Sequence, residues 1–127
     1  MTIKSTGYFR EMIDGNPSDP SIKDFINKNT DYPIDKICKY LDSGLPLIVS
    51  PGLVLDVIDE SKGDAGSPSI LTDGKWAWSG VLSYYVKNYN LMLDSDFIDT
   101  MISNDWRILV KEEDLDYSNI LLDGTPI

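Results

Sequence analysis

The sequence contains no histidine. Histidine is the general base of Ser-His-Asp and Cys-His hydrolases and the commonest metal-binding side chain in proteins. Its absence excludes these hydrolytic mechanisms and every metal site that needs an imidazole ligand. Phosphate-binding glycine motifs are also missing, because the chain has neither a G-x-x-x-x-G-K-[ST] nor a G-x-G-x-x-G pattern.

Cysteine occurs once, at Cys38, so the chain cannot form an internal disulfide. Cys38 lies on the apolar stripe of an expected helix, which predicts a buried, unreactive thiol rather than a nucleophile. Apolar runs of about 18–20 residues, long enough to cross a membrane, are absent, and residues 1–7 lack the hydrophobic core of a signal peptide. We therefore expect a cytoplasmic protein that does not bind membranes.

Basic residues are few, with 11 against 21 acidic ones and a net charge of −10. They are scattered singly, whereas binding to the phosphates of nucleic acids requires clusters of Lys and Arg. Nucleic acid is therefore not an expected partner. A surface of this charge suits a basic protein, because opposite charges speed association. The alternative is that the acidity serves solubility alone.

The acidic residues are concentrated towards the C-terminus. Residues 94–127 carry nine acidic and two basic residues, a net charge of −7, whereas residues 1–93 carry a net charge of −3. Solubility does not require such a concentration, so these acids are candidates for contacting a partner. The candidates are Asp94, Asp96, Asp99, Asp105, Glu112, Glu113, Asp114 and Asp116.

Two other acidic patterns give little support for a metal site or for catalysis. Asp114-x-Asp116-x-Ser118 matches the first ligand positions of a calcium loop, but Asn119 replaces the required glycine and Thr125 the required glutamate. Pairs of carboxylates could serve acid–base catalysis, but among 21 carboxylates some pair always fits. We expect no cofactor, no metal and no enzymatic activity.

The spacing of apolar residues predicts one globular domain over residues 1–127, with residues 105–127 as an acidic C-terminal segment. Helices are predicted from about Pro20 to Ile26 and over about 33–43, 79–88 and 94–104. β-strands are predicted over 45–49, 53–58, 69–72, 75–78 and 107–110. Because helices and strands do not alternate regularly, the expected class is α+β, with a small, mostly antiparallel sheet and about four short helices.

Turn residues predict the end of one helix and the position of one hairpin. Gly44 is expected to end the second helix in a left-handed conformation. Asp73-Gly74 predicts a hairpin with a type I′ turn, in which both residues have positive φ. Trp76 and Trp78, two residues apart on the second strand, share one face. They are candidates for an aromatic recognition surface, and the alternative is that at least one belongs to the core.

The hairpin and the following helix resemble a bacterial protein family. Residues 71–78 read LTDGKWAW and residues 82–86 read LSYYV, followed by Leu93 and Phe97. The family pattern is LTDG-x-W-x-W, then L-x-YYV and a leucine-rich closing helix. Earlier residues also fit, namely Gly44, Val49, Pro51-Gly52 and Asp56-Val57, so the resemblance covers about residues 20–104.

This family includes immunity proteins of polymorphic-toxin and contact-dependent growth-inhibition systems, which bind and neutralise a cognate toxin in the cytosol. The resemblance implies a fold and a class of partner, but no catalytic or binding residues. It leaves the acidic segment 105–127 outside the matched region, where partner specificity could lie.

The resulting hypothesis is an immunity protein that binds a basic toxin domain such as a nuclease, whose phosphate-binding surface an anionic patch can cover. The first alternative is an adaptor or regulatory domain that binds another cytosolic protein. The second is a small enzyme that uses carboxylates. The sequence does not indicate an oligomeric state.

Overall fold

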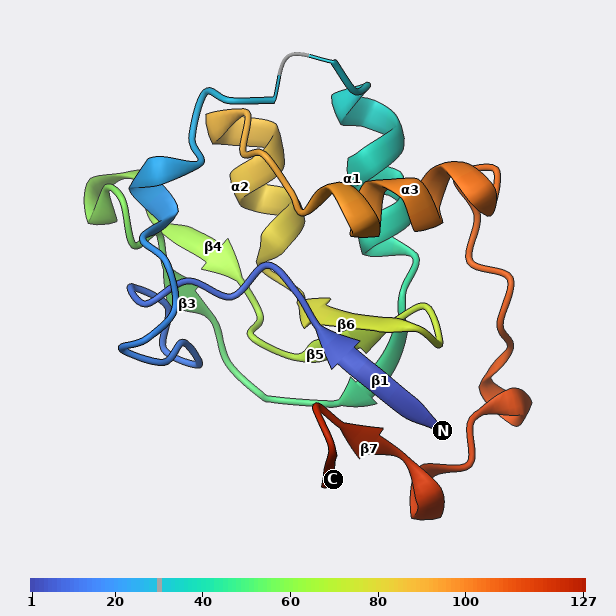
Figure 1. Cartoon of the computed structure of the whole chain (residues 1–127). Helices are drawn as coiled ribbons and strands as arrows, with labels where there is room; N and C mark the ends of the chain where they lie inside the picture. Colours follow the sequence, from blue (N-terminus) through green and yellow to red (C-terminus); the bar gives the residue numbers. More distant parts are fainter. Residues whose placement is uncertain (30) are drawn as a thin grey trace.

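A computed structural model describes residues 1–29 and 31–127. It contains a six-stranded mixed sheet in the order β2-β5-β6-β1-β7-β8 and a separate two-stranded sheet of β3 and β4 (Figure 1). The strands are β1 (Thr2–Ser5), β2 (Leu45–Ile48), β3 (Val54–Leu55), β4 (Asp64–Gly66), β5 (Ile70–Thr72), β6 (Trp76–Ser79), β7 (Leu121–Leu122) and β8 (Thr125–Pro126).

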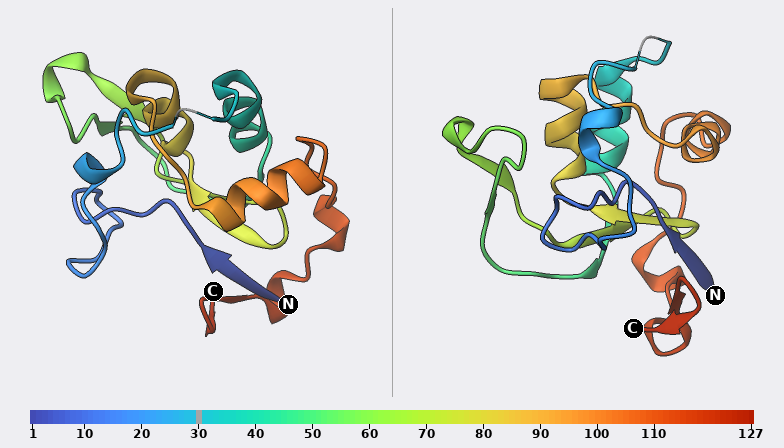
Figure 2. Two further views of the ribbon diagram at one scale, coloured as in Figure 1. Left: turned by 45° about the horizontal axis from the view of Figure 1, so that its top comes forward. Right: turned by 60° about the vertical axis from the view of Figure 1, so that its left-hand side comes forward.

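Three α-helices lie on one side of the six-stranded sheet (Figures 1 and 2). Leu115 and Ile120, which precede β7, pack on the other side. The helices are α1 (Ile34–Asp42), α2 (Leu82–Tyr89) and α3 (Ser95–Ser103). The described residues also form four single turns of 3₁₀ helix, namely η1 (Ile22–Asp24), η2 (Glu60–Lys62), η3 (Glu112–Asp114) and η4 (Tyr117–Asn119). None of the helices in the described residues is long and apolar enough to cross a membrane.

The expected α+β class is confirmed, and its details are partly corrected. Three of the five strand pairings in the large sheet are antiparallel, but β1 runs parallel to both of its neighbours, β6 and β7. The predicted helix from Pro20 to Ile26 is only the single turn η1, capped by the Ser21 side chain. It stops there because the chain turns to meet α2, with Asn27 in a left-handed conformation and its N–H donated to Tyr89 O.

The predicted pairing of β5 with β6 across the Asp73-Gly74 turn is confirmed, but other strands pair with segments further away in the chain. The segments 45–49 and 53–58 do not pair with each other, because β2 pairs with β5 and β3 pairs with β4. No strand forms over 107–110, and β7 and β8 lie further along the chain. The N-terminal strand β1, which the sequence analysis missed, occupies the centre of the sheet between β6 and β7.

Two hydrophobic clusters lie on the two faces of the sheet. Trp76 and Trp78 face the helices, and Trp78 packs with Tyr40 and Phe97 at ring separations of 6.0 and 5.1 Å. Ala77, which points the opposite way in the strand, belongs to a second cluster with Ile3, Leu47, Leu115 and Ile120. The C-terminal segment therefore supplies apolar side chains that cover the second face.

Two details of α1 differ from expectation. Gly44 does not have a positive φ, and glycine is required there because a Cβ atom would lie 2.6 Å from the Trp78 ring. Cys38 is half-buried rather than fully buried, with its thiol 3.6 Å from Ser83 O. Burial, followed by the nearby Asp42 and Asp35, raises the pKa of this thiol, which agrees with an unreactive cysteine.

Candidate functional site

Helix α3 carries the first group of predicted acidic residues. Asp94 caps its N-terminus by accepting the N–H of Asp96 at 2.9 Å, and Phe97, Ile98 and Met101 point into the core. The helical spacing then directs Asp96 and Asp99 outward, and both are exposed. The helix therefore holds these two carboxylates in fixed positions on the surface.

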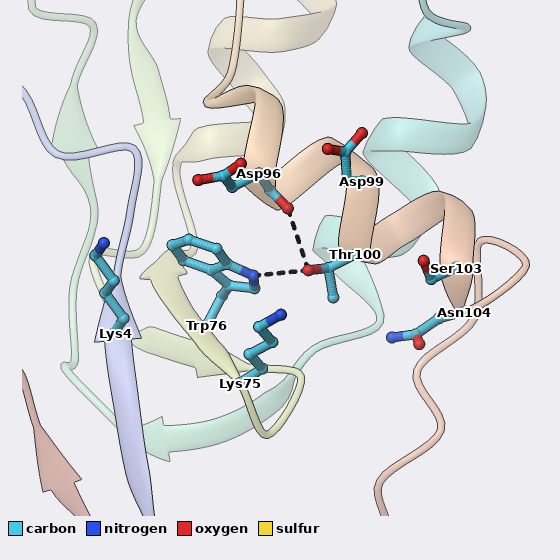
Figure 3. Close-up of a pocket in the computed structure, with 8 residues that line it drawn as sticks. All are labelled: Lys4, Lys75, Trp76, Asp96, Asp99, Thr100, Ser103 and Asn104. Atoms are coloured by element: carbon cyan, nitrogen blue, oxygen red, sulfur yellow. Dashed lines mark hydrogen bonds between the residues drawn. The ribbon is translucent and has the colours of Figure 1, made fainter.

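A groove of about 600 Å³ lies beside α3 (Figure 3). Its walls come from α3, from β1 and from the turn between β5 and β6. The residues that line it are Lys4, Lys75, Trp76, Asp96, Asp99, Thr100, Ser103 and Asn104. Three of the residues predicted from the sequence, Trp76, Asp96 and Asp99, thus meet in one place.

Trp76 lies in the buried floor of this groove. Its indole N–H donates to Thr100 Oγ1 at 2.9 Å, and the Thr100 hydroxyl donates to Asp96 O at 3.2 Å (Figure 3). The residue is only 5% exposed. Its orientation is set by this hydrogen bond and by packing against Phe97 at 5.7 Å. Trp76 therefore belongs to the core and presents almost no surface to a partner, which corrects its inclusion among the binding candidates.

The groove contains charges of both signs that are not paired with each other. Lys4 and Lys75 lie on the strand side, and Asp96 and Asp99 lie on the helix side (Figure 3). In the described part of the chain the only ion pairs are Arg10–Glu11 and Arg107–Asp105. Lys4 instead lies over the Trp76 ring, with its Nζ 5.6 Å from the ring centre. Both lysines and both aspartates thus remain available to a partner.

The β5–β6 turn that presents Lys75 is built differently from the expected type I′ turn. Only Gly74 has a positive φ, of 95°, whereas Asp73 does not. Asp73 is buried, and its carboxylate accepts the N–H groups of Lys75 and Trp76 at 2.8 and 2.6 Å. The Tyr40 hydroxyl donates to the second carboxylate oxygen at 2.6 Å, and burial, followed by this hydrogen bond, raises the pKa of Tyr40. A side chain on α1 therefore helps to set the turn.

The second group of acidic residues lies on the C-terminal segment. Asp114 accepts the N–H of Lys111 at 2.9 Å, and Asp116 accepts the N–H of Ser118 at 3.3 Å and the Asn119 amide at 2.6 Å. The pattern that resembled a calcium loop therefore folds as two successive 3₁₀ turns, whose carboxylates bind the backbone of their own turns. Asp105 lies at the start of the segment, with its Oδ2 atom 4.0 Å from Nη2 of Arg107.

This segment is an integral part of the fold, although its acids are exposed. Leu115 and Ile120 are 6% and 2% exposed and pack against Ile3 and Ala77. β7 then pairs with β1, and the Asp123 side chain accepts the backbone N–H of Ser5 at 2.9 Å. The acidic side chains are thus displayed by a backbone that the core holds in place.

The eight predicted acids are all exposed but do not form one continuous cluster. Asp94, Asp96 and Asp99 lie on α3, above the sheet in Figure 1, whereas η3 and η4 lie beside and below it. Trp78 is fully buried and its indole N–H donates to Leu41 O at 3.1 Å. It presents no surface to a partner, which corrects its inclusion among the binding candidates.

The basic residues of the groove, Lys4 and Lys75, were not predicted from the sequence. Lys75 directly follows the predicted Asp73-Gly74 turn, so its place at the hairpin tip could have been recognised. Lys4 gave no such signal, because its position depends on the parallel pairing of β1 with β6, in which Lys4 lies opposite Trp76.

No model of a known protein family matches this chain, and neither a curated protein nor a solved structure matches it. The resemblance to immunity proteins therefore rests only on the sequence motifs quoted above.

Proposed function

We propose that this protein is an inhibitor of the immunity-protein type, which binds a basic toxin domain through α3 and the acidic C-terminal segment. The observation that carries the proposal is that all eight predicted acids are exposed on a backbone anchored in the core. A nuclease is the partner that fits best, because a nuclease active site carries the basic surface that binds nucleic acid phosphates.

The arrangement of the carboxylates supports tight association. Asp94, Asp114 and Asp116 each bind backbone N–H groups of their own turns, so little side-chain freedom is lost on binding. Their negative field would attract a basic partner before contact. Lys4 and Lys75 in the groove would add selectivity, since a partner that presents only basic groups there meets repulsion.

The proposal can be tested by co-expressing this chain with the protein encoded immediately upstream. We expect the two proteins to copurify and this chain to abolish the toxicity of its neighbour. The association rate should fall steeply between about 50 and 500 mM NaCl, because salt screens charges separated by more than a Debye length.

Charge-removing variants test which surface makes the contact. Glu112→Gln, Glu113→Gln, Asp114→Asn and Asp116→Asn together should weaken the complex by about tenfold, equivalent to about 1.4 kcal/mol, and the loss should shrink in high salt. Asn and Gln retain the shape and one acceptor oxygen. We expect a change in the free energy of unfolding of about 1 kcal/mol or less, because all four residues are exposed.

The matched control removes four exposed acids elsewhere, namely Asp24, Asp35, Glu60 and Asp64. Both variants change the net charge equally. An equal loss of affinity would therefore show that binding depends on the net charge and not on the position of the acidic residues. An Asp96→Asn, Asp99→Asn double variant examines the groove separately. If neither the groove variant nor the C-terminal variant affects the complex, this surface is not the interface.

A further inference from the structure

An apolar hollow of about 310 Å³ lies between the N-terminal loop and strand β3. Its floor includes Met12, Val81 and Tyr85, which are 7%, 3% and 1% exposed. Ile13 and Leu55 also line it and remain 75% and 48% exposed. Large apolar side chains around a concave space of this size are typical of a ligand site.

A second, acidic pocket of about 250 Å³ adjoins the hollow. Asp14, Asp19 and Asp123 line it, together with Ser5 and Asn16. The two cavities share two residues, Tyr8 and Asp14. Neither cavity has a lysine or arginine among the described residues that line it. The pair therefore combines an apolar compartment with a negatively charged one.

Tyr8, at the junction, has a buried hydroxyl with no hydrogen-bond partner in the described part of the chain. Such groups are rare in folded proteins, because the loss of water is not compensated. Tyr8 lines the acidic pocket together with Asp14 and Asp123, and burial, followed by the charges of these two carboxylates, raises its pKa. The hydroxyl is closed off from solvent, so a positively charged group in the acidic pocket would lie beside Tyr8 and face the carboxylates.

The carboxylates that line the acidic pocket can accept further hydrogen bonds. Asp123 already accepts the backbone N–H and the hydroxyl of Ser5, at 2.9 and 2.5 Å, and Asp19 accepts the N–H of Asn16 at 2.8 Å. Asp14 accepts no hydrogen bond from the other described residues, and each ionised carboxylate offers about four lone-pair sites. Asp14 is thus the principal free acceptor at the junction.

We infer that these two cavities form a binding site for a small organic cation, with an apolar body in the hollow and an ammonium group at Asp14, beside Tyr8. The site does not depend on the proposed function. In Figure 1 residues 8–20, β3 and β4 lie on the left, whereas the C-terminal end of α3 and η3 lie on the right, and the left view of Figure 2 agrees. From the C-terminal segment, Leu122 and Asp123 line the acidic pocket.

The test uses phenylbutylamine, which is a cation at neutral pH, and its neutral and anionic analogues phenylbutanol and phenylbutyrate. Each is titrated into the isotope-labelled protein while backbone amide NMR signals are followed. The amine should shift signals of residues 8–14, 54–57 and 79–85 with a dissociation constant of about 1 mM or tighter, as expected for a fragment-sized ligand. The alcohol should bind at least about fivefold more weakly, and the carboxylate weakest of the three.

Variants separate the two compartments. Asp14→Asn should weaken the amine about fivefold and leave the alcohol unchanged, whereas Ile13→Ser should weaken both. Tyr8→Phe should not lower the melting temperature, because the hydroxyl has no partner to lose in the free protein. Asp24→Asn, an exposed change outside both cavities, is the control and should change nothing.

Three results would overturn the inference. The first is equal affinity for all three compounds, which would remove the role of charge. The second is amine binding that neither Asp14→Asn nor Ile13→Ser reduces, or no shifts at these residues. The third is tighter binding of a phenylalanyl-lysine amide than of the amine, which would assign the site to a segment of a partner protein.

Discussion

Asp56 is the carboxylate that the fold surrounds most completely. It is fully buried and accepts hydrogen bonds from the hydroxyls of Tyr84 and Tyr89 at 2.7 and 2.6 Å and from the N–H groups of Ile58 and Asp59 at 2.7 and 2.9 Å. Burial alone would raise its pKa, but the hydrogen bonds from the two tyrosines and two backbone groups outweigh it and lower the pKa. Asp56 therefore fastens the segment after β3 to α2.

Asp56→Asn should lower the free energy of unfolding by about 3 kcal/mol, because the amide group would bring a donor towards groups that themselves donate. The measurement is urea denaturation at neutral pH. Asp64→Asn, an exposed change on neighbouring β4, is the control and should stay within about 0.5 kcal/mol.

The same variant carries a pH signature. Because the folded pKa of Asp56 is lowered, its stabilisation is present above the unfolded value of about 3.9 and is lost as pH falls through the folded pKa. Wild-type stability should therefore fall below about pH 4, and less steeply in Asp56→Asn. Identical slopes would show that Asp56 is not held ionised.

At the scale of elements, the β5–β6 hairpin depends on Gly74. Its φ of 95° is a conformation that side chains with a branched Cβ resist, and a Cβ there would lie 3.4 Å from the Val110 side chain. The turn also positions Lys75 and Trp76 in the groove. Local backbone strain at this one residue would therefore affect both stability and the candidate site.

Gly74→Val should destabilise the protein by roughly 1–2 kcal/mol or more. Gly52→Val is an informative comparison, because Gly52 has a similar φ of 91° but a Cβ added there would have no atom within 4 Å. A larger loss at Gly74 than at Gly52 would separate the contact with Val110 from backbone strain. An unchanged melting temperature for Gly74→Val would contradict this turn geometry.

The C-terminal segment acts as the cover of the second sheet face. Ile120→Ala should cost about 2–4 kcal/mol, because it leaves a cavity against Ile3 and Ala77. Leu109→Ala, on the same segment but 57% exposed, should cost less than about 1 kcal/mol. If both changes had equally small effects in thermal unfolding, the segment would be a detachable tail.

At the scale of the whole molecule, the excess of negative charge destabilises the folded state. The net charge is −10, and the two ion pairs found among the described residues are both on the surface. Mutual repulsion of the carboxylates should therefore lower stability in dilute buffer, and salt should relieve it.

Raising NaCl from about 10 to 300 mM should accordingly raise the melting temperature at neutral pH. The variant that neutralises Glu112, Glu113, Asp114 and Asp116 should show a smaller increase, because fewer charges remain to be screened. A melting temperature that falls with salt would indicate that favourable ion pairs, rather than repulsion, dominate the electrostatics of this protein.

The sequence by itself determined the elements whose signals are local. The apolar stripe of α1, with Ile37 and Leu41 buried, follows from a 3.6-residue period. The hairpin at Asp73-Gly74 and the helix capped by Asp94 follow from turn and cap chemistry. The exposure of the C-terminal acids likewise follows from the cost of burying unpaired charge.

Only the tertiary structure decided what depends on residues far apart in the chain. The parallel pairing of β1 with β6 and β7 joins the two ends of the sequence to its middle, and strands of two to four residues carry too little pattern to specify such partners. That pairing places Lys4 beside Trp76 and turns an acidic tail into part of the sheet. The hollow at Tyr8 also depends on the tertiary structure, because a cavity forms where segments distant in the sequence pack against one another and leave space between them.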